Sequence, residues 1–383
     1  MSTPAARTAL SPRVALVRAR YDPAGGAERF VQAAMAALQA QGVDVTIVSR
    51  QWPGAHGEAI IVDPFHVGSL WRDASFASAA CRELSRRHFD LVQSHERIAC
   101  CDVYRAGDGV HAEWLAQRSR VQSPAAALAT RLSPHHRYLL AAERRLFTSS
   151  RLAAVICNSE MVRREIAARF ATPPEKLELI RNAVDAEHFN PAARLGLRDA
   201  VRQQLGIPRE ATVFLHVGSG FERKGVAALL AALSRAPGKP WAIVAGRDKR
   251  GAAYLEMARR LGLAERVRFV GSVSDVRAYH GAADAFVLAS LYDPFPNAAL
   301  EALASGLPVV TSTRCGVAEL LREGESGFVC DALDVDSIAH ALARLEPPVA
   351  RRMGEAAREA VAALTPAAMA QRYAALYARL IRR

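Results

Sequence analysis

Two carboxylates, Asp293 and Glu301, stand eight positions apart in the stretch YDPFPNAALEALASGLPVV. Asn297 between them is a candidate N-cap residue, which would place Asp293 in the preceding loop and Glu301 one turn into a helix. Backbone N–H groups at the start of a helix bind anions, and carboxylates accept hydrogen bonds from hydroxyls. The arrangement therefore suits a nucleotide-sugar. Two acids that only complement the helix dipole are the alternative, and the spacing alone leaves it open.

A second group of candidate residues occurs in HVGSGFERKG, residues 216–225. A buried strand is predicted to end at Val217, Gly218 permits close approach to the backbone, and the next predicted helix opens with Arg223 and Lys224. Two cations at the start of a helix oppose its dipole unless an anion shares the site. A diphosphate held by the guanidinium and the ammonium would resolve this conflict. A solvated pair of cations is the alternative.

A weaker signal, PAGGAE, follows the first predicted strand. Its glycines, Gly25 and Gly26, allow close approach of an anion to the start of the predicted helix that follows. The segment is not GxGxxG, and no Lys-Ser/Thr follows it, so the dinucleotide fingerprint and the P-loop are both absent. This disfavours a dehydrogenase, and a purely structural turn is the alternative for the two glycines.

Buried apolar segments alternate with helical segments along the 383 residues. The alternation predicts parallel sheets covered by helices, and its restart after residue 190 predicts an α/β architecture of two doubly wound, Rossmann-like domains. Ligands of such sheets bind at the carboxyl ends of the strands, which here would face an interdomain cleft. We expect an acceptor-binding N-terminal domain over 1–185, a nucleotide-sugar-binding domain over 186–365, and a helix over 366–383 that crosses back to the N-terminal domain. The predicted strands lie within 14–19, 43–49, 89–94, 152–159, 212–218, 241–246, 267–271, 283–289 and 307–312.

The composition favours a cytoplasmic protein with an anionic partner. The chain has 50 basic and 38 acidic residues, a net charge of +12, and no apolar segment typical of a signal peptide or a spanning helix. No nucleic-acid-binding module is recognisable, so nucleic acid is not expected. The six cysteines show no metal-ligand spacing, and reduced thiols are expected.

Residues 111–151 carry seven arginines and two glutamates, interspersed with apolar segments. A basic amphipathic helix can lie on an anionic leaflet, so this segment suggests a peripheral contact with an anionic inner membrane. A helical excursion packed on the domain is the alternative.

The segments HVGSGFERKG, VAGRDK, VRFVGSVSDVRAYHGAADAFVLAS, YDPFPNAALEALASGLPVV and GVAELL, in this order, resemble the C-terminal domain of retaining glycosyltransferases of family 4. That family has the GT-B fold of two facing Rossmann-like domains. The similarity extends to PAGGAERF, GDGVHAEWLAQR and HRYLLAAERRLF, and so covers essentially the whole chain. Within the family, the pattern is most similar to lipopolysaccharide core α-1,3-glucosyltransferases, which transfer glucose from UDP-glucose to an inner-core heptose.

The resemblance implies a role for each candidate residue. Glu301 would bind the ribose hydroxyls and Asp293 those of the transferred sugar, whereas Arg223 and Lys224 match the basic pair that neutralises the diphosphate. The other implied roles are approach to the phosphates for Gly25 and Gly26, a place at the reaction centre for Asp108 and His111, and donor binding for Gly218, Phe295, Asn297 and Ala298. The chain departs from the family where Asp293 replaces a glutamate and Phe295-Pro296 replaces Phe-Gly. Because Pro296 has no N–H, one amide contact is missing or shifted to Asn297.

The resemblance also implies the reaction. We expect retaining transfer of a hexose, glucose in the first instance, from a UDP-sugar to a lipopolysaccharide core or similar lipid-linked glycan. No metal and no cofactor besides the donor are expected. Two alternatives stay open: a UDP-sugar epimerase of the same architecture, and a non-catalytic protein that binds a nucleotide-sugar. Release of UDP that depends on an acceptor separates a transferase from both.

Overall fold

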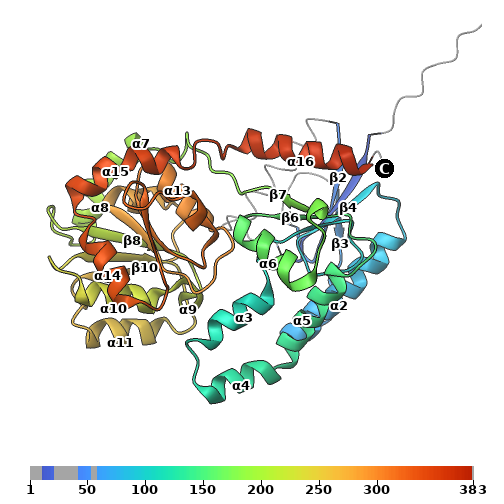
Figure 1. Ribbon diagram of the computed structural model, residues 1–383, viewed down its shortest axis with the longest axis horizontal. Coiled ribbons are helices and arrows are strands. Elements are labelled where there is room, and N and C mark those ends of the chain that lie inside the picture. Colours follow the sequence, from blue (N-terminus) through green and yellow to red (C-terminus); the bar gives the residue numbers. More distant parts are fainter. Residues whose placement is uncertain (1–10, 21–41, 53–57, 382–383) are drawn as a thin grey trace, which may run out of the picture.

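The computed structural model describes residues 11–20, 42–52 and 58–381. The protein contains two parallel sheets, each in its own lobe (Figure 1). The strand orders are β3-β2-β1-β4-β5-β6-β7 and β10-β9-β8-β11-β12-β13. All pairings between these strands are parallel. The predicted pair of doubly wound, Rossmann-like sheets is thereby confirmed. We call the halves built on the first and second sheet the N-terminal lobe and the C-terminal lobe.

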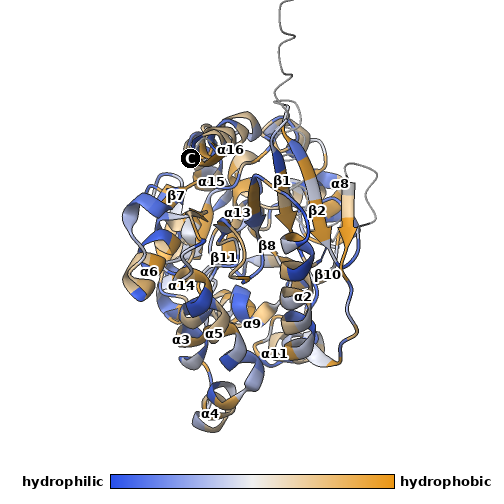
Figure 2. Cartoon of the chain, turned by 90° about the vertical axis from the view of Figure 1, so that its right-hand side faces the viewer, coloured by the Kyte–Doolittle hydropathy of each residue, from blue (hydrophilic) through white to orange (hydrophobic). Residues whose placement is uncertain are grey.

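The N-terminal sheet is buried on both faces. Its strands are β1 (Arg13–Val17), β2 (Asp44–Ser49), β3 (Glu58–Ile61), β4 (Leu91–Ser94), β5 (Val103–Arg105), β6 (Ala154–Cys157) and β7 (Leu177–Leu179). Helices α2 (Gly68–Ser85), α5 (Pro134–Phe147) and α6 (Glu160–Phe170) pack on one face through residues such as Phe76, Leu146 and Ile166. The C-terminal helix α16 (Pro366–Ile381) packs on the other face through Tyr373 and Tyr377. Figure 2 shows β1 and β2 coloured mainly as hydrophobic, as expected for strands covered on both sides.

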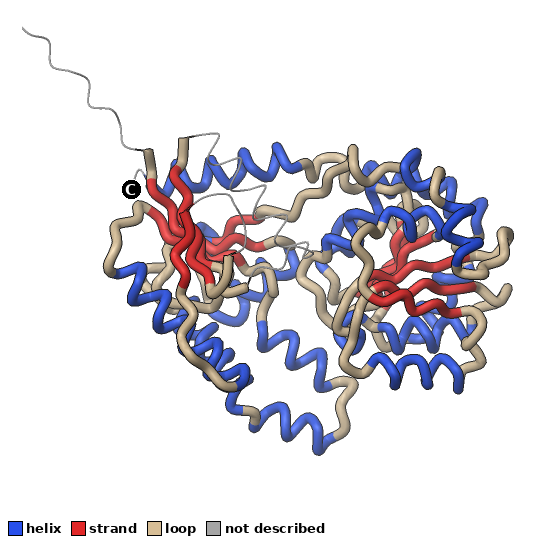
Figure 3. Tube along the Cα trace, turned by 180° about the vertical axis from the view of Figure 1, so that it is seen from behind, coloured by secondary structure: helices blue, strands red, loops and turns tan. Residues whose placement is uncertain are grey.

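The C-terminal sheet is also covered on both faces (Figure 3). Its strands are β8 (Val213–Val217), β9 (Trp241–Ala245), β10 (Val267–Gly271), β11 (Ala285–Leu288), β12 (Val309–Ser312) and β13 (Gly327–Cys330). Helices α10 (Val226–Arg235), α11 (Gly251–Arg260) and α14 (Val335–Ala343) pack on one face. The other face is covered by α8 (Arg198–Gln204), α12 (Arg277–Ala282), α13 (Asn297–Ala304) and the end of α15 (Pro347–Glu359).

A helical excursion leaves the N-terminal lobe after β5. It consists of α3 (His111–Ser119), α4 (Pro124–Leu132) and α5, and α4 extends away from both sheets (Figure 1). No residue of α4 is buried. The end of α3 contacts the C-terminal lobe, because Arg118 pairs with Glu222 at 2.9 Å and Arg120 pairs with Asp331 at 3.0 Å.

The cysteine prediction was wrong for two of the six residues. Cys81 in α2 and Cys100 after β4 form a disulfide, because the packing of α2 on the sheet brings their Cα atoms to 5.8 Å. Cys101, Cys157, Cys315 and Cys330 are buried free thiols. None of the helices that the structure describes has the length and apolar content needed to cross a membrane.

Candidate active site

A cleft of about 570 Å³ lies where the carboxyl ends of the two sheets face each other. The parallel register aligns strand ends, with Val17 beside Ser94 and Val217 beside Ala245, so residues that follow these strands meet at the cleft. The lining residues that the sequence predicted are Asp108, Gly218, Arg223, Lys224, Phe295, Asn297, Ala298 and Glu301. Gly25 and Gly26 lie outside the described residues.

Lys224 forms the central ion pair of the site. Its ammonium contacts the Asp293 carboxylate, and these side chains are only 11% and 6% exposed. Arg223 lies further out, with its Nη1 3.9 Å from Asp293 Oδ1 and 3.5 Å from the Tyr292 carbonyl oxygen to which it donates. Lys224 is therefore not a solvated cation. Asp293 lies behind the cationic pair rather than in the cleft lining, with its charge directed at Lys224.

The chain places this cationic pair differently from the prediction. Arg223 and Lys224 do not open the long helix but end a one-turn helix, α9 (Phe221–Lys224), and α10 begins after Gly225. Gly225 has a φ of +76°, and a Cβ there would lie 1.9 Å from the Ala289 carbonyl oxygen. Glycine is therefore required for the turn that separates the two helices.

The start of α13 also differs from the prediction. Asn297 is the first helical residue, and Pro296 occupies the N-cap position without a side-chain cap. The Asn297 side chain is instead engaged across the cleft, because Asn182 Nδ2 donates to its Oδ1 at 2.7 Å and to the Phe295 carbonyl oxygen at 3.0 Å. Asn182 in turn accepts from Arg105 at 2.6 Å. This chain of hydrogen bonds joins the end of β5 to the predicted donor loop.

Besides Gly107, four residues of the N-terminal lobe line the cleft without having been predicted: Arg18, His95, Arg105 and Asn182. Three of them lie at or just after the ends of β1, β4 and β5, so the rule that ligands bind at strand ends was a usable signal. Burial lowers the pKa of His95 well below its ordinary value, and the charges of Arg105 and Arg18 lower it further. A neutral imidazole at this point can donate or accept a hydrogen bond to a ligand hydroxyl.

Asp108 and His111 were both predicted at the reaction centre, but only Asp108 lines the cleft. Asp108 is exposed in the cleft wall, and the preceding Gly107 carbonyl accepts a hydrogen bond from Asn158 at 3.2 Å. His111 begins α3, is buried, and has its Nε2 3.1 Å from His136 Nδ1. Burial, together with Arg97, His136 and His135, lowers its pKa to about 3, so the ring is neutral. His111 does not line the cleft, and its part in a reaction stays a prediction.

Among the residues that the structure describes, no group of three or more His, Cys, Asp or Glu is placed to hold a metal ion. His216 is fully buried, and burial followed by the Lys224 charge lowers its pKa to about 4. Lys224 and Arg223, at the end of α9, are therefore the cations that border the cleft from the C-terminal lobe.

Both lobes match profiles of known protein families. Residues 24–188 match the family described as Glycosyltransferase Family 4, and residues 198–360 match the family described as Glycosyl transferases group 1. The two matches span the N-terminal lobe and the C-terminal lobe in turn. The chain therefore belongs to the family 4, group 1 glycosyltransferases, which have the GT-B fold, and is an enzyme of the hexosyltransferase class.

Individual relatives align over most of the chain. The lipopolysaccharide glucosyltransferase WaaG of Escherichia coli (strain K12) is 26% identical over 82% of this chain and 84% of its own length. The lipopolysaccharide core biosynthesis glycosyltransferase LpsE of Rhizobium meliloti (strain 1021) is 27% identical over 84% and 85%. The crystal structure of WaaG superposes with a TM-score of 0.82 at 23% identity, covering 95% of this chain and 99% of WaaG. HepE of Anabaena in complex with UDP-glucose gives a TM-score of 0.69 at 20% identity, covering 96% and 99%.

Proposed function

We propose that the protein transfers a hexose, glucose in the first instance, from a UDP-sugar to the core of a lipopolysaccharide or a similar lipid-linked glycan, with retention of configuration. The observation that carries the proposal is the pair Arg223 and Lys224 at the end of α9, facing Asp108 across a cleft that also contains Glu301. A diphosphate at the cation pair would leave the sugar between the lobes, within reach of an acceptor on the side of Asp108.

The chemistry follows from where charge develops. The bond between the anomeric carbon and the UDP oxygen breaks, the bond from that carbon to the acceptor oxygen forms, and the products are the glycosylated acceptor, UDP and a proton. Negative charge grows on the departing diphosphate, where Arg223 and Lys224 stabilise it without reorganising. In this proposal Glu301 binds the ribose hydroxyls and Asp293 binds sugar hydroxyls once the donor has drawn Lys224 toward the phosphates.

The donor and acceptor classes rest on the relatives. HepE was solved with UDP-glucose, WaaG is named a lipopolysaccharide glucosyltransferase, and LpsE is named for lipopolysaccharide core biosynthesis. These relatives favour a transferase over the two alternatives, a UDP-sugar epimerase and a non-catalytic nucleotide-sugar-binding protein. We also propose that no metal takes part, because the two cations already supply positive charge at the diphosphate.

The deciding experiment measures UDP release by the purified protein over a panel of UDP- and GDP-sugars, with and without a heptose-terminated lipopolysaccharide core. Release from UDP-glucose that requires the core, and that persists in excess EDTA, is the expected result. UDP release without acceptor dependence, or conversion of the donor sugar, would favour an epimerase or a hydrolase. The double variant Arg223→Ala/Lys224→Ala should fold but lose transfer, whereas Lys249→Ala, which removes an exposed lysine of the same lobe, should keep it.

Peripheral membrane contact is part of the proposal, and helix α4 supports it. Its apolar residues Leu128 and Leu132 are 56% and 60% exposed, next to Arg131. Apolar side chains beside a cation on a projecting helix suit the headgroup region of an anionic leaflet. Sedimentation with vesicles containing anionic lipid should fall in Leu128→Ser/Leu132→Ser and persist in Leu255→Ser, an exposed leucine of α11. The absence of wild-type binding to such vesicles would contradict membrane contact.

A further inference from the structure

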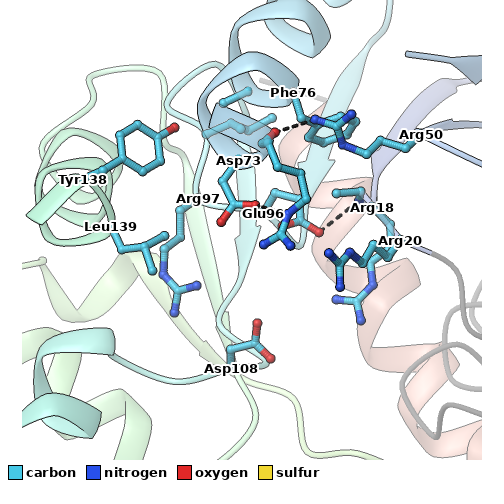
Figure 4. Close-up of a pocket in the computed structure, with 14 residues that line it drawn as sticks. Arg18, Arg20, Arg50, Asp73, Phe76, Glu96, Arg97, Asp108, Tyr138 and Leu139 are labelled. Carbon is cyan, nitrogen blue, oxygen red and sulfur yellow. Dashed lines mark hydrogen bonds and ion pairs between the residues drawn. The ribbon is translucent and has the colours of Figure 1, made fainter. Parts of the chain in front are cut away.

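A second cavity, of about 270 Å³, opens beside the cleft in the N-terminal lobe (Figure 4). Its walls include residues 18–20 after β1, residues 72, 73, 76 and 77 of α2, residues 96–98 after β4, and Tyr138 with Leu139 of α5. Arg18 and Asp108 line both this cavity, which we call the arginine pocket, and the donor cleft. A molecule in the arginine pocket would therefore reach the cleft at Asp108.

Five arginines and three acids line the arginine pocket: Arg18, Arg20, Arg50, Arg72, Arg97, Asp73, Glu96 and Asp108. One of the arginines has a structural role. The Arg50 guanidinium pairs with Asp63 at 2.5 Å, donates to the Pro64 carbonyl oxygen at 3.3 Å and to that of Arg72, and lies 5.3 Å from the centre of the Phe76 ring. Its hydrogen bonds hold the start of α2 against the sheet.

Three other arginines of the pocket have N–H groups that make no hydrogen bond with a described residue. Arg72 uses its Nε for Asp73 at 2.7 Å, which leaves both terminal nitrogens for a ligand. Arg97 uses Nε for the buried Glu143 at 3.0 Å and Nη2 for the Gly109 carbonyl oxygen at 3.4 Å, which leaves Nη1. Arg20 is exposed and makes no hydrogen bond or ion pair with any residue that the structure describes. Figure 4 shows the guanidinium groups of Arg97 and Arg20 pointing toward the end of the pocket at Asp108.

The acids of the pocket are mostly occupied by partners within the lobe. Asp73 pairs with Arg72 and with His135, at 2.7 and 2.9 Å, and Glu96 accepts from the Ala19 backbone at 2.9 Å. Asp108 makes no hydrogen bond or ion pair with a described side chain. The unused donors therefore come from arginines, and the unused acceptor that borders the donor cleft is Asp108.

We propose that the arginine pocket binds the acceptor sugar and that Arg20, Arg72 and Arg97 hold an oxyanion, a phosphate ester or a carboxylate, carried by that sugar. This inference rests on the proposed transferase function and specifies its acceptor. Guanidinium groups bind planar or tetrahedral oxyanions through paired hydrogen bonds, which neutral hydroxyls cannot match in strength. Tyr138 and Leu139 supply apolar surface for a sugar ring, and Asp108 then faces the accepting hydroxyl at the mouth of the cleft.

Binding without turnover tests the proposal. Deacylated lipopolysaccharide core oligosaccharide is prepared in three forms: intact, with its phosphates removed, and with its carboxylates reduced. Calorimetry measures the affinity of each form for the full-length protein saturated with UDP. We expect one of the two treatments to weaken binding roughly 10- to 100-fold, and the treatment that does so identifies the oxyanion.

Three single variants make the test specific. Arg20→Ala and Arg72→Ala should weaken binding of the intact form by roughly tenfold or more and leave binding of the treated form within about twofold. Arg82→Ala, an exposed arginine ten positions further along α2 than Arg72, should change neither affinity. Arg97 is not substituted, because its removal would leave the buried Glu143 carboxylate without its ion-pair partner. Thermal melting verifies that Arg72→Ala is folded, and Arg20 has no partner among the described residues whose loss could unfold the chain.

The outcomes separate the two proposals. Equal affinity of the wild type for all three forms, or variants that bind like the wild type, would overturn the oxyanion site while leaving the transferase intact. Absence of UDP binding in a separate titration with UDP alone would instead contradict the proposed function. Failure of every form of the oligosaccharide to bind a UDP-loaded protein would overturn the assignment of this acceptor to the pocket.

Discussion

The Tyr292 hydroxyl donates a hydrogen bond to Glu165 Oε2 at 2.7 Å and accepts one from the Val110 backbone N–H at 2.9 Å. Tyr292 follows β11 in the C-terminal lobe, whereas Glu165 in α6 and Val110 before α3 belong to the N-terminal lobe. Burial raises the pKa of Tyr292 well above its ordinary value, so the phenol remains a donor. One hydroxyl thus connects the loop that carries Asp293 to the loop that carries Asp108.

Tyr292→Phe should loosen this connection. The variant leaves the Val110 N–H without its partner, and an unpaired buried N–H costs about 1–3 kcal/mol. We expect kcat for transfer to fall at least tenfold, because the lobes must meet for the acceptor to reach the donor, whereas UDP affinity should stay within about twofold. Steady-state kinetics and calorimetry measure the two quantities. Tyr254→Phe, in which a tyrosine of the same lobe loses a hydroxyl that makes no hydrogen bond with described residues, should leave both unchanged.

Glu165 should make stability depend on pH. Burial raises its pKa from 4.5 to about 7, with further effects from Tyr292, Glu113, Arg314 and Arg169. Between these values the folded protein binds more protons than the unfolded chain, so the free energy of unfolding falls as pH rises through this window. The loss is on the order of 3 kcal/mol.

Chemical denaturation of the wild type and Glu165→Gln at pH 5 and pH 8 checks this expectation. From pH 5 to pH 8 the unfolding free energy of the wild type should fall relative to that of Glu165→Gln, because the amide does not ionise. Glu256→Gln, an exposed glutamate of α11, should keep the wild-type profile. Parallel pH profiles for the wild type and Glu165→Gln would show that Glu165 titrates at its ordinary pKa.

Gly109 should be irreplaceable because of Tyr292. It has a φ of +68°, and a Cβ there would lie 2.3 Å from the Tyr292 hydroxyl and 2.8 Å from Pro294 Cγ. Gly262 has the same φ of +68° with no atom within 4 Å, so Gly262→Ala isolates the backbone strain that both variants share. We expect Gly109→Ala to reduce transfer at least tenfold more than Gly262→Ala does. Equal transfer rates in the two variants would mean that the lobes need not meet at Gly109.

The sequence predicted the sheets well where strands are buried apolar segments of ordinary length. It did not predict β3, β5, β7 or β13. Of these, β5 and β7 are only three residues long and therefore carry little periodicity. The disulfide between Cys81 and Cys100 also escaped prediction, because it depends on how α2 packs beside the segment after β4.

The two sides of the candidate site also differ in how far the sequence could predict them. In the C-terminal lobe the residues of the cleft lie in contiguous motifs, so their types and spacing were enough to select Arg223, Lys224 and Glu301. In the N-terminal lobe the lining residues come from separate strand ends, and the strand order that gathers them is not written in any one motif. Asn297 was assigned as an N-cap from local preference, but its partner Asn182 is 115 positions away. Tertiary contacts of this kind override local propensity.

A double-mutant cycle on Lys224 and Asp293 should separate the stability of the site from its chemistry. Lys224→Ala leaves the Asp293 carboxylate, 6% exposed, with Arg223 at 3.9 Å as a distant partner, and breaking a buried pair in this way costs about 3 kcal/mol or more. Adding Asp293→Asn removes the stranded charge, so unfolding free energy should largely recover. Transfer should not recover, because the cation that stabilises the leaving diphosphate is still missing, and kcat should stay about 100- to 1,000-fold below the wild type. Denaturation and UDP-release assays on the four proteins measure both effects. If kcat recovered together with stability, Lys224 would act by neutralising Asp293 rather than by binding the diphosphate.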